Sequence, residues 1–123
     1  MVNQKEEPNK WMEKAERDLM SANVNSEQGI FDVAAFLAHQ AAEKALKTLY
    51  IVKFKRLWKI HDLNELGKSI GAPKTILVAC DALNPHYIQT RYPTETTYTK
   101  EMAEDAIKNS EKVIEWSKKS LKK

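Results

Sequence analysis

Two residues in the middle of the chain have the types that cutting or binding RNA requires. Arg56 and His61 stand five positions apart in the stretch RLWKIHDL. A histidine can take the proton from a 2′-hydroxyl, and an arginine can stabilise the charge that develops on the attacked phosphate. The spacing Arg-x4-His is therefore compatible with a metal-independent endoribonuclease. It is also compatible with a segment that only binds phosphate, or with a helix-starting His61 and a solvated Arg56.

The same pair lies in the most basic part of the chain. Between Glu43 and Asp62 there is no acidic residue, whereas six lysines and arginines occur there, and the whole chain has a net charge of only +3. Such a segment attracts phosphate by Coulomb focusing. Lys44 and Lys47 are therefore candidate phosphate contacts. The alternative is that they run their aliphatic stems along a helix and place their charges in solvent.

A further cation with nearby rings occurs later in the chain. Arg91 is flanked by Tyr92 and, more loosely, by Tyr87. Such a set can hold a phosphate and stack a base, so Arg91 and Tyr92 are candidate nucleotide-binding residues. The alternative, which we favour from the residues alone, is that Arg91 pairs with a buried carboxylate such as Asp18 while the tyrosines pack on the helices.

Other familiar site types are missing from the sequence. His39, His61 and His86 lie far apart and lack the spacing of helical metal ligands, and no glycine-rich phosphate loop occurs. Cys80 is the only cysteine, so no disulfide can form within the chain, and its place on an apolar stripe favours a core position. We therefore expect no metal and no other cofactor.

The totals favour an ordinary globular protein of the reducing cytoplasm. The 123 residues suit one domain, and hydrophobic and charged residues make up 42% and 30% of them. No apolar run approaches the roughly 20 residues of a membrane helix. The start MVNQKEEPNK is polar and unlike a secretory signal. These features predict a cytoplasmic protein without a membrane partner.

Helical periodicity must supply the elements that position these residues. Only three glycines and four prolines are present, and strand-like alternation is missing. The sequence predicts five helices, with a further turn near residues 86–91, and no sheet. The expected helices cover about residues 9–25, 32–53, 61 to 67–71, 72–83 and 99–121. Pro8 and Asn9 mark the start of the first helix, and Asp32, Asp62 and Thr99 are the expected N-caps of the second, third and last. We expect an all-α, antiparallel up-and-down bundle with a four-helix core, forming a single domain over residues 1–123.

The second expected helix has two stripes. One is rich in alanine, which lets neighbouring helices approach closely and predicts a central position in the bundle. The other stripe is also partly apolar, so it should meet another helix, a second subunit or a ligand. This second stripe consists of Phe36, Gln40, Glu43, Lys47 and Tyr50. Asp18 falls on the core face of the first helix, where a carboxylate needs a partner.

Several of these segments, taken together and in order, resemble the HEPN family, the higher-eukaryote and prokaryote nucleotide-binding domains. The segments are Trp11-x3-Ala15-x2-Asp18-Leu19, the run HQAAEKALK from His39 to Lys47, His61-Asp62-Leu63, Arg91-Tyr92-Pro93 and a late Trp116. The resemblance covers about residues 9–120. The run QAAEKALK and the tripeptide Arg-Tyr-Pro are fairly specific as a pair.

The resemblance implies a helical bundle that commonly dimerises. Small members often act beside a minimal nucleotidyltransferase in toxin–antitoxin-like pairs. Many members are metal-independent RNases with an Arg-x4–6-His motif, and others are thought to bind nucleotides or act as scaffolds. In this chain Leu57 follows Arg56 where nuclease members have a polar residue, and the pair precedes the short middle helix rather than the last one. We therefore expect a nucleotide- or RNA-phosphate-binding protein, with an endoribonuclease or a non-catalytic adaptor as alternatives.

Overall fold

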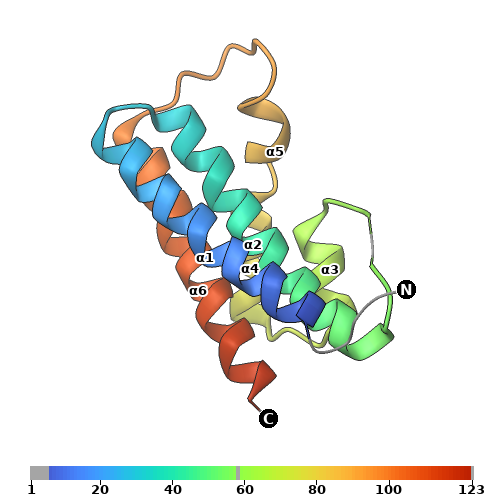
Figure 1. The fold of residues 1–123 in the computed structure, drawn as a ribbon. Coiled ribbons are helices and arrows are strands. Elements are labelled where there is room, and N and C mark those ends of the chain that lie inside the picture. The colour runs from blue at the N-terminus through green and yellow to red at the C-terminus, as the bar shows by residue number, and fades with distance from the viewer. Residues whose placement is uncertain (1–5, 58, 123) are drawn as a thin grey trace.

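The computed structural model describes residues 6–57 and 59–122, and every regular element in them is a helix. There are five helices of seven residues or more and one four-residue helical turn, as the periodicity predicted. The elements are α1 Glu6–Glu27, α2 Phe31–Phe54, α3 Leu63–Ser69, α4 Lys74–Leu83, α5 His86–Gln89 and α6 Lys100–Leu121. The predicted all-α bundle is confirmed (Figure 1).

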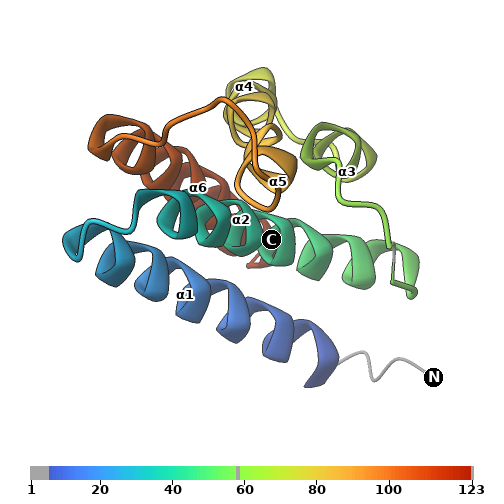
Figure 2. The ribbon, with the colours of Figure 1, turned by 90° about the horizontal axis from the view of Figure 1, so that it is seen from above.

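Helix α2 occupies the centre of the bundle. It packs against α1 and α6 along its length, and α3 and α5 contact it as well. Seen from above, α1 covers one side of α2, while α3, α4 and α5 lie on the other side (Figure 2). Helix α2 is therefore a shared wall between two sets of neighbours, and side chains on its opposite faces meet different parts of the chain.

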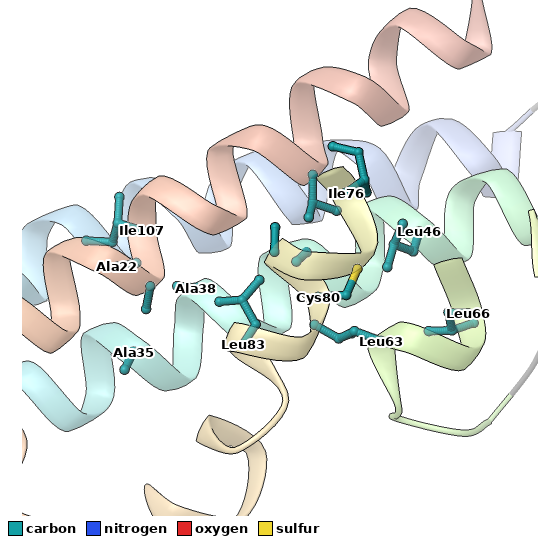
Figure 3. Packing of buried hydrophobic residues seen from close by; sticks show 14 of the residues in the cluster. Ala22, Ala35, Ala38, Leu46, Leu63, Leu66, Ile76, Cys80, Leu83 and Ile107 are labelled. Carbon is teal, nitrogen blue, oxygen red and sulfur yellow. The ribbon is translucent and has the colours of Figure 1, made fainter. Parts of the chain in front are cut away.

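Small side chains allow this close packing. Six alanines of α2 are fully buried: Ala34, Ala35, Ala38, Ala41, Ala42 and Ala45. Larger side chains from the shorter helices fill the remaining space. Leu63 and Leu66 of α3 and Cys80 and Leu83 of α4 belong to the same core cluster as Leu46 (Figure 3). The predicted core position of Cys80 is confirmed.

Two predicted helix caps are confirmed. The Asp62 carboxylate accepts hydrogen bonds from the backbone N–H groups of Asn64 and Glu65 at the start of α3. At the start of α6, the Thr99 hydroxyl accepts from the backbone N–H of Met102. These side chains satisfy donors that have no partner within the first helical turn.

Two expected boundaries were wrong. Helix α1 begins at Glu6 rather than at residue 9, because Pro8 fits within the first turn, where its missing N–H costs no hydrogen bond. Ile30 occupies the N-cap position of α2 without a side-chain cap, and Asp32 lies inside the first turn instead. There the Asp32 carboxylate accepts from the backbone N–H of Val33.

Candidate functional site

The six cations of residues 44–59 do not form the single patch that the sequence suggested. Four of them donate to groups on different sides of α2 or at its end, and Arg56 and Lys59 are exposed. Lys44 binds Asp18, Lys47 binds Glu43, Lys53 binds the Ser69 carbonyl and Lys55 binds the Val52 carbonyl. These cations are close in sequence but not in space, because successive positions of a helix point in different directions.

A buried carboxylate on α2 organises the strongest cluster. Glu43 Oε2 accepts from Lys47 Nζ at 2.9 Å, and Glu43 Oε1 lies 2.9 Å from His61 Nδ1. The side chains of Glu43 and Lys47 are each 5% exposed, whereas that of His61 is 44% exposed. Because a carboxylate accepts, the Nδ1 atom of His61 carries the proton in this contact. The Nε2 atom is then left to accept or donate elsewhere.

Local capping places His61 beside α5. The Asn84 side chain accepts from the backbone N–H of Leu63 at 2.9 Å and donates to Asp62 Oδ1 at 3.1 Å. These bonds tie the start of α3 to the proline-containing break between α4 and α5. They explain how two segments more than 20 residues apart in sequence meet at the site.

Tyr87 of α5 joins His61 to a second cation. The His61 and Tyr87 rings are stacked with centroids 4.6 Å apart. The Arg91 guanidinium lies over the Tyr87 ring at 4.7 Å and over the Tyr92 ring at 5.7 Å. Arg91 and Tyr92 are both exposed. The cluster therefore presents a histidine and an arginine at the surface, and both of them contact the same tyrosine ring.

Two further histidines lie on α2 and α5. His39 is fully buried on α2, its ring 5.4 Å from that of Tyr87, and burial lowers its pKa to about 4. Its Nδ1 atom lies 3.3 Å from the Gln40 side-chain nitrogen. Burial also lowers the pKa of His86, whose Nδ1 atom lies 2.6 Å from the Tyr98 hydroxyl. Both rings are therefore neutral near pH 7 and add no charge to the site.

The structure uses some predicted site residues and leaves others apart. His61, Arg91 and Tyr92 come together through Tyr87. Lys47 lies at the base of the cluster and is neutralised by Glu43, so it does not present a charge to solvent. Lys44 is engaged with Asp18, which confirms that Asp18 has a structural partner, although the partner is not Arg91. Arg56 is exposed, and no contact within the described part of the chain links it to this cluster.

Two central residues of the cluster, Glu43 and Tyr87, could not be identified from the sequence alone. Glu43 belonged to the second stripe of α2, and its i, i+4 spacing to Lys47 signalled an ion pair. Its bond to His61 could not be read from sequence because it joins positions 18 residues apart. Tyr87 stood out only as a ring near Arg91. Its contact with His61 depends on how α3 and α5 pack.

The arrangement suits anion binding and proton transfer. Arg91 offers a planar fork of donors that matches phosphate geometry. His61 can donate from Nε2 when charged, or accept a proton there when neutral. Within residues 6–57 and 59–122, no three His, Cys, Asp or Glu side chains are grouped so that they could hold a metal ion. Over the same ranges, no helix is long and apolar enough to cross a membrane.

Comparison with solved structures places the fold among close structural neighbours. The structure of TT1696 from Thermus thermophilus is similar with a TM-score of 0.84 and 28% identity, over 91% of this chain and 96% of that one. The structure of ST0689, an archaeal HEPN homologue, is similar with a TM-score of 0.80 and 28% identity, over 92% and 96% of the two chains. No curated protein matches the sequence.

The family comparison agrees with these structural similarities. The model of the HEPN domain matches residues 8–121, nearly the whole chain. Three of the segments that suggested this resemblance, around His39, His61 and Arg91, come into contact with Tyr87 in the fold. The chain belongs to the HEPN domain family.

Proposed function

We propose that this HEPN-domain protein binds the phosphate of a nucleotide or of RNA between His61 and Arg91. The observation that supports this most is the contact of both side chains with the Tyr87 ring, at 4.6 Å and 4.7 Å. Two groups able to carry positive charge are thereby held at one exposed place. Other lysines near the site are already paired with buried carboxylates.

The surroundings of the pair favour a nucleotide over a simple anion. Tyr92 is 57% exposed and lies against the Arg91 guanidinium, so its ring is accessible to a base. Stacking on an aromatic ring contributes roughly 1–3 kcal/mol per base. A ligand with both a phosphate and a base would therefore use Arg91, His61 and Tyr92 together.

Titration with ATP and with a short RNA at low salt tests this proposal. Amide signals of residues 44–61 and 86–92 should shift, and Arg91→Ala should weaken binding of both ligands. Lys119→Ala, on the exposed surface of α6, is a matched removal of one positive charge and should have little effect. Unshifted signals around both segments would refute phosphate binding here.

A second candidate function is metal-independent cleavage of RNA. The contact between Glu43 and His61 favours it, because a proton fixed on Nδ1 leaves Nε2 as the atom that can act as a general base. The sequence suggested Arg56 as the cation, and we retain it as a candidate beside Arg91. RNA that is cut in the presence of EDTA by the natural protein, but not by His61→Ala, would establish this activity. Loss in Arg56→Ala or in Arg91→Ala would identify the cation.

We also propose that the chain forms a homodimer and works with a minimal nucleotidyltransferase in a toxin–antitoxin-like pair. Family resemblance supports both ideas, and half-buried Phe36 on α2 is the side chain we assign to an interface. Sedimentation of the pure protein tests the dimer, which Phe36→Asp should dissociate. Co-purification with a nucleotidyltransferase encoded in the adjacent reading frame tests the pair. A monomer that captures no such enzyme would contradict both.

A further inference from the structure

A second basic and aromatic surface lies between α1 and α2, away from Arg91. A groove of about 280 Å³ is lined by Lys10, Trp11, Lys14 and Lys44. Asp18 accepts from Lys44 at 2.6 Å and lies 3.3 Å from Lys14, so one buried carboxylate offsets one of the three lysines. The groove therefore keeps an excess of positive charge beside an indole ring.

This groove is connected to the His61 site through α2. Lys47 Nζ lies 5.9 Å from the centre of the Trp11 ring and 2.9 Å from Glu43 Oε2. The other oxygen of Glu43 contacts His61. Trp11 and His61 are thus joined by only two intervening side chains. Both intervening side chains are 5% exposed, so this contact chain runs beneath the surface and places the groove close to the His61 site.

We propose that the Trp11 groove holds a second nucleotide of a single-stranded RNA whose neighbouring phosphate is bound at His61 and Arg91. The inference rests on the proposed function and specifies its ligand as a polynucleotide rather than a free mononucleotide. The base packs along the indole and the lysine stems, and the following phosphate meets Lys10 and Lys14. Aromatic platforms flanked by cations bind single strands in this way without reading their sequence.

The chain carries a matched control on its far side. Trp116 lies in a groove of about 320 Å³ with Lys112 and Lys119 on α6. That groove has the same kinds of side chain, together with Glu115, but no contact connects it to His61 in the described residues. If any pairing of tryptophan and lysine sufficed to hold RNA, the two grooves would contribute alike.

The test compares AMP with a 2′-O-methyl adenosine tetranucleotide, which lacks the hydroxyl needed for cleavage. Calorimetric titration should show that the tetranucleotide binds about tenfold more tightly than AMP to the natural protein. Trp11→Leu and Lys10→Glu should remove most of this advantage and leave AMP affinity unchanged. Trp116→Leu and Lys112→Glu should leave both affinities unchanged. Lys10 is exposed, so Lys10→Glu decides the matter if Trp11→Leu fails to fold.

Four results would overturn the inference. Equal losses in Trp11→Leu and Trp116→Leu would mean that binding is unspecific. An equal loss of AMP and tetranucleotide affinity in Trp11→Leu and Lys10→Glu would mean that these residues only support the His61 site. Normal AMP binding with no higher affinity for the tetranucleotide would rule out the groove as a binding site but leave the proposed function intact. Absence of binding to either ligand would remove both.

Discussion

Replacing Glu43 by glutamine should strongly destabilise the fold. The substitution keeps the size of the side chain but removes its charge, and it leaves the ammonium group of Lys47 buried without a counter-ion. Both side chains are 5% exposed, so water cannot replace the lost partner. Breaking a buried pair by removing one member costs about 3–5 kcal/mol. Because the glutamine oxygen still accepts one hydrogen bond, we expect a loss near the lower end, about 3 kcal/mol.

Urea unfolding followed by far-ultraviolet circular dichroism measures this loss. The matched control is Glu16→Gln, which breaks the ion pair with Lys118. That pair is 2.6 Å long, but its side chains are 47% and 49% exposed, so we expect a loss of at most about 1 kcal/mol. The double variant Glu43→Gln/Lys47→Met should recover much of the lost stability, because it leaves no unpaired charge.

The outcome that would refute this reasoning is equally specific. If Glu43→Gln and Glu16→Gln lose the same small amount, the Glu43–Lys47 pair is not a buried charge pair in solution. If Glu43→Gln is strongly destabilised but the double variant recovers nothing, the loss comes from the contact with His61 rather than from Lys47. Either result would change which residue fixes the base of the site.

Three other perturbations follow from the same structure. The pKa of His39 is lowered to about 4 in the folded protein, whereas its value in the unfolded chain is near 6.5. As the pH drops from about 6.5 toward 4, the unfolded chain therefore binds a proton that the folded protein does not, and the free energy of unfolding falls. Urea titrations should show stability about 2 kcal/mol lower at pH 5 than at pH 7, with His86 adding in the same direction and His39→Gln reducing the difference. Burial raises the pKa of Cys80 to about 12, so a thiol reagent at pH 8 should react with it only as fast as the protein unfolds. Asp62→Ala should cost about 1–2 kcal/mol in urea unfolding, since Asp62 caps α3 and binds Asn84, and the amide signal of His61 should shift as its position loosens.

Local signals in the sequence predicted most of the fold. The alanine stripe placed the second helix at the centre, and Asp62 and Thr99 marked two helix starts correctly. The start of α1 was predicted too late because Pro8 was interpreted as a boundary, although proline is compatible with a first turn. Asp32 was assigned to a cap by residue type alone, whereas the geometry of the α1–α2 turn gives that position to Ile30.

The candidate site was less predictable because it depends on packing between distant segments. His61 and Arg91 were identified by residue type, yet their connection through Tyr87 depends on the contact between α5 and the start of α3. Lys44 and Lys47 were treated as outward charges. In the structure Lys44 binds a carboxylate on α1 and Lys47 binds one on α2 itself. Other elements surround α2 closely, so these lysine side chains lie against protein groups rather than in solvent. Charge along the sequence was therefore a poor guide to charge on the surface.

The most direct measurement of phosphate binding follows the ring nitrogens of His61 during titration with AMP. Long-range proton–nitrogen spectra report the protonation and hydrogen bonding of each imidazole nitrogen. If the phosphate is held between His61 and Arg91, the Nε2 signal of His61 shifts on saturation while Nδ1 remains bonded to Glu43, and Arg91→Ala weakens the response. An Nε2 signal that stays unchanged while AMP saturates the protein would contradict a phosphate site at His61.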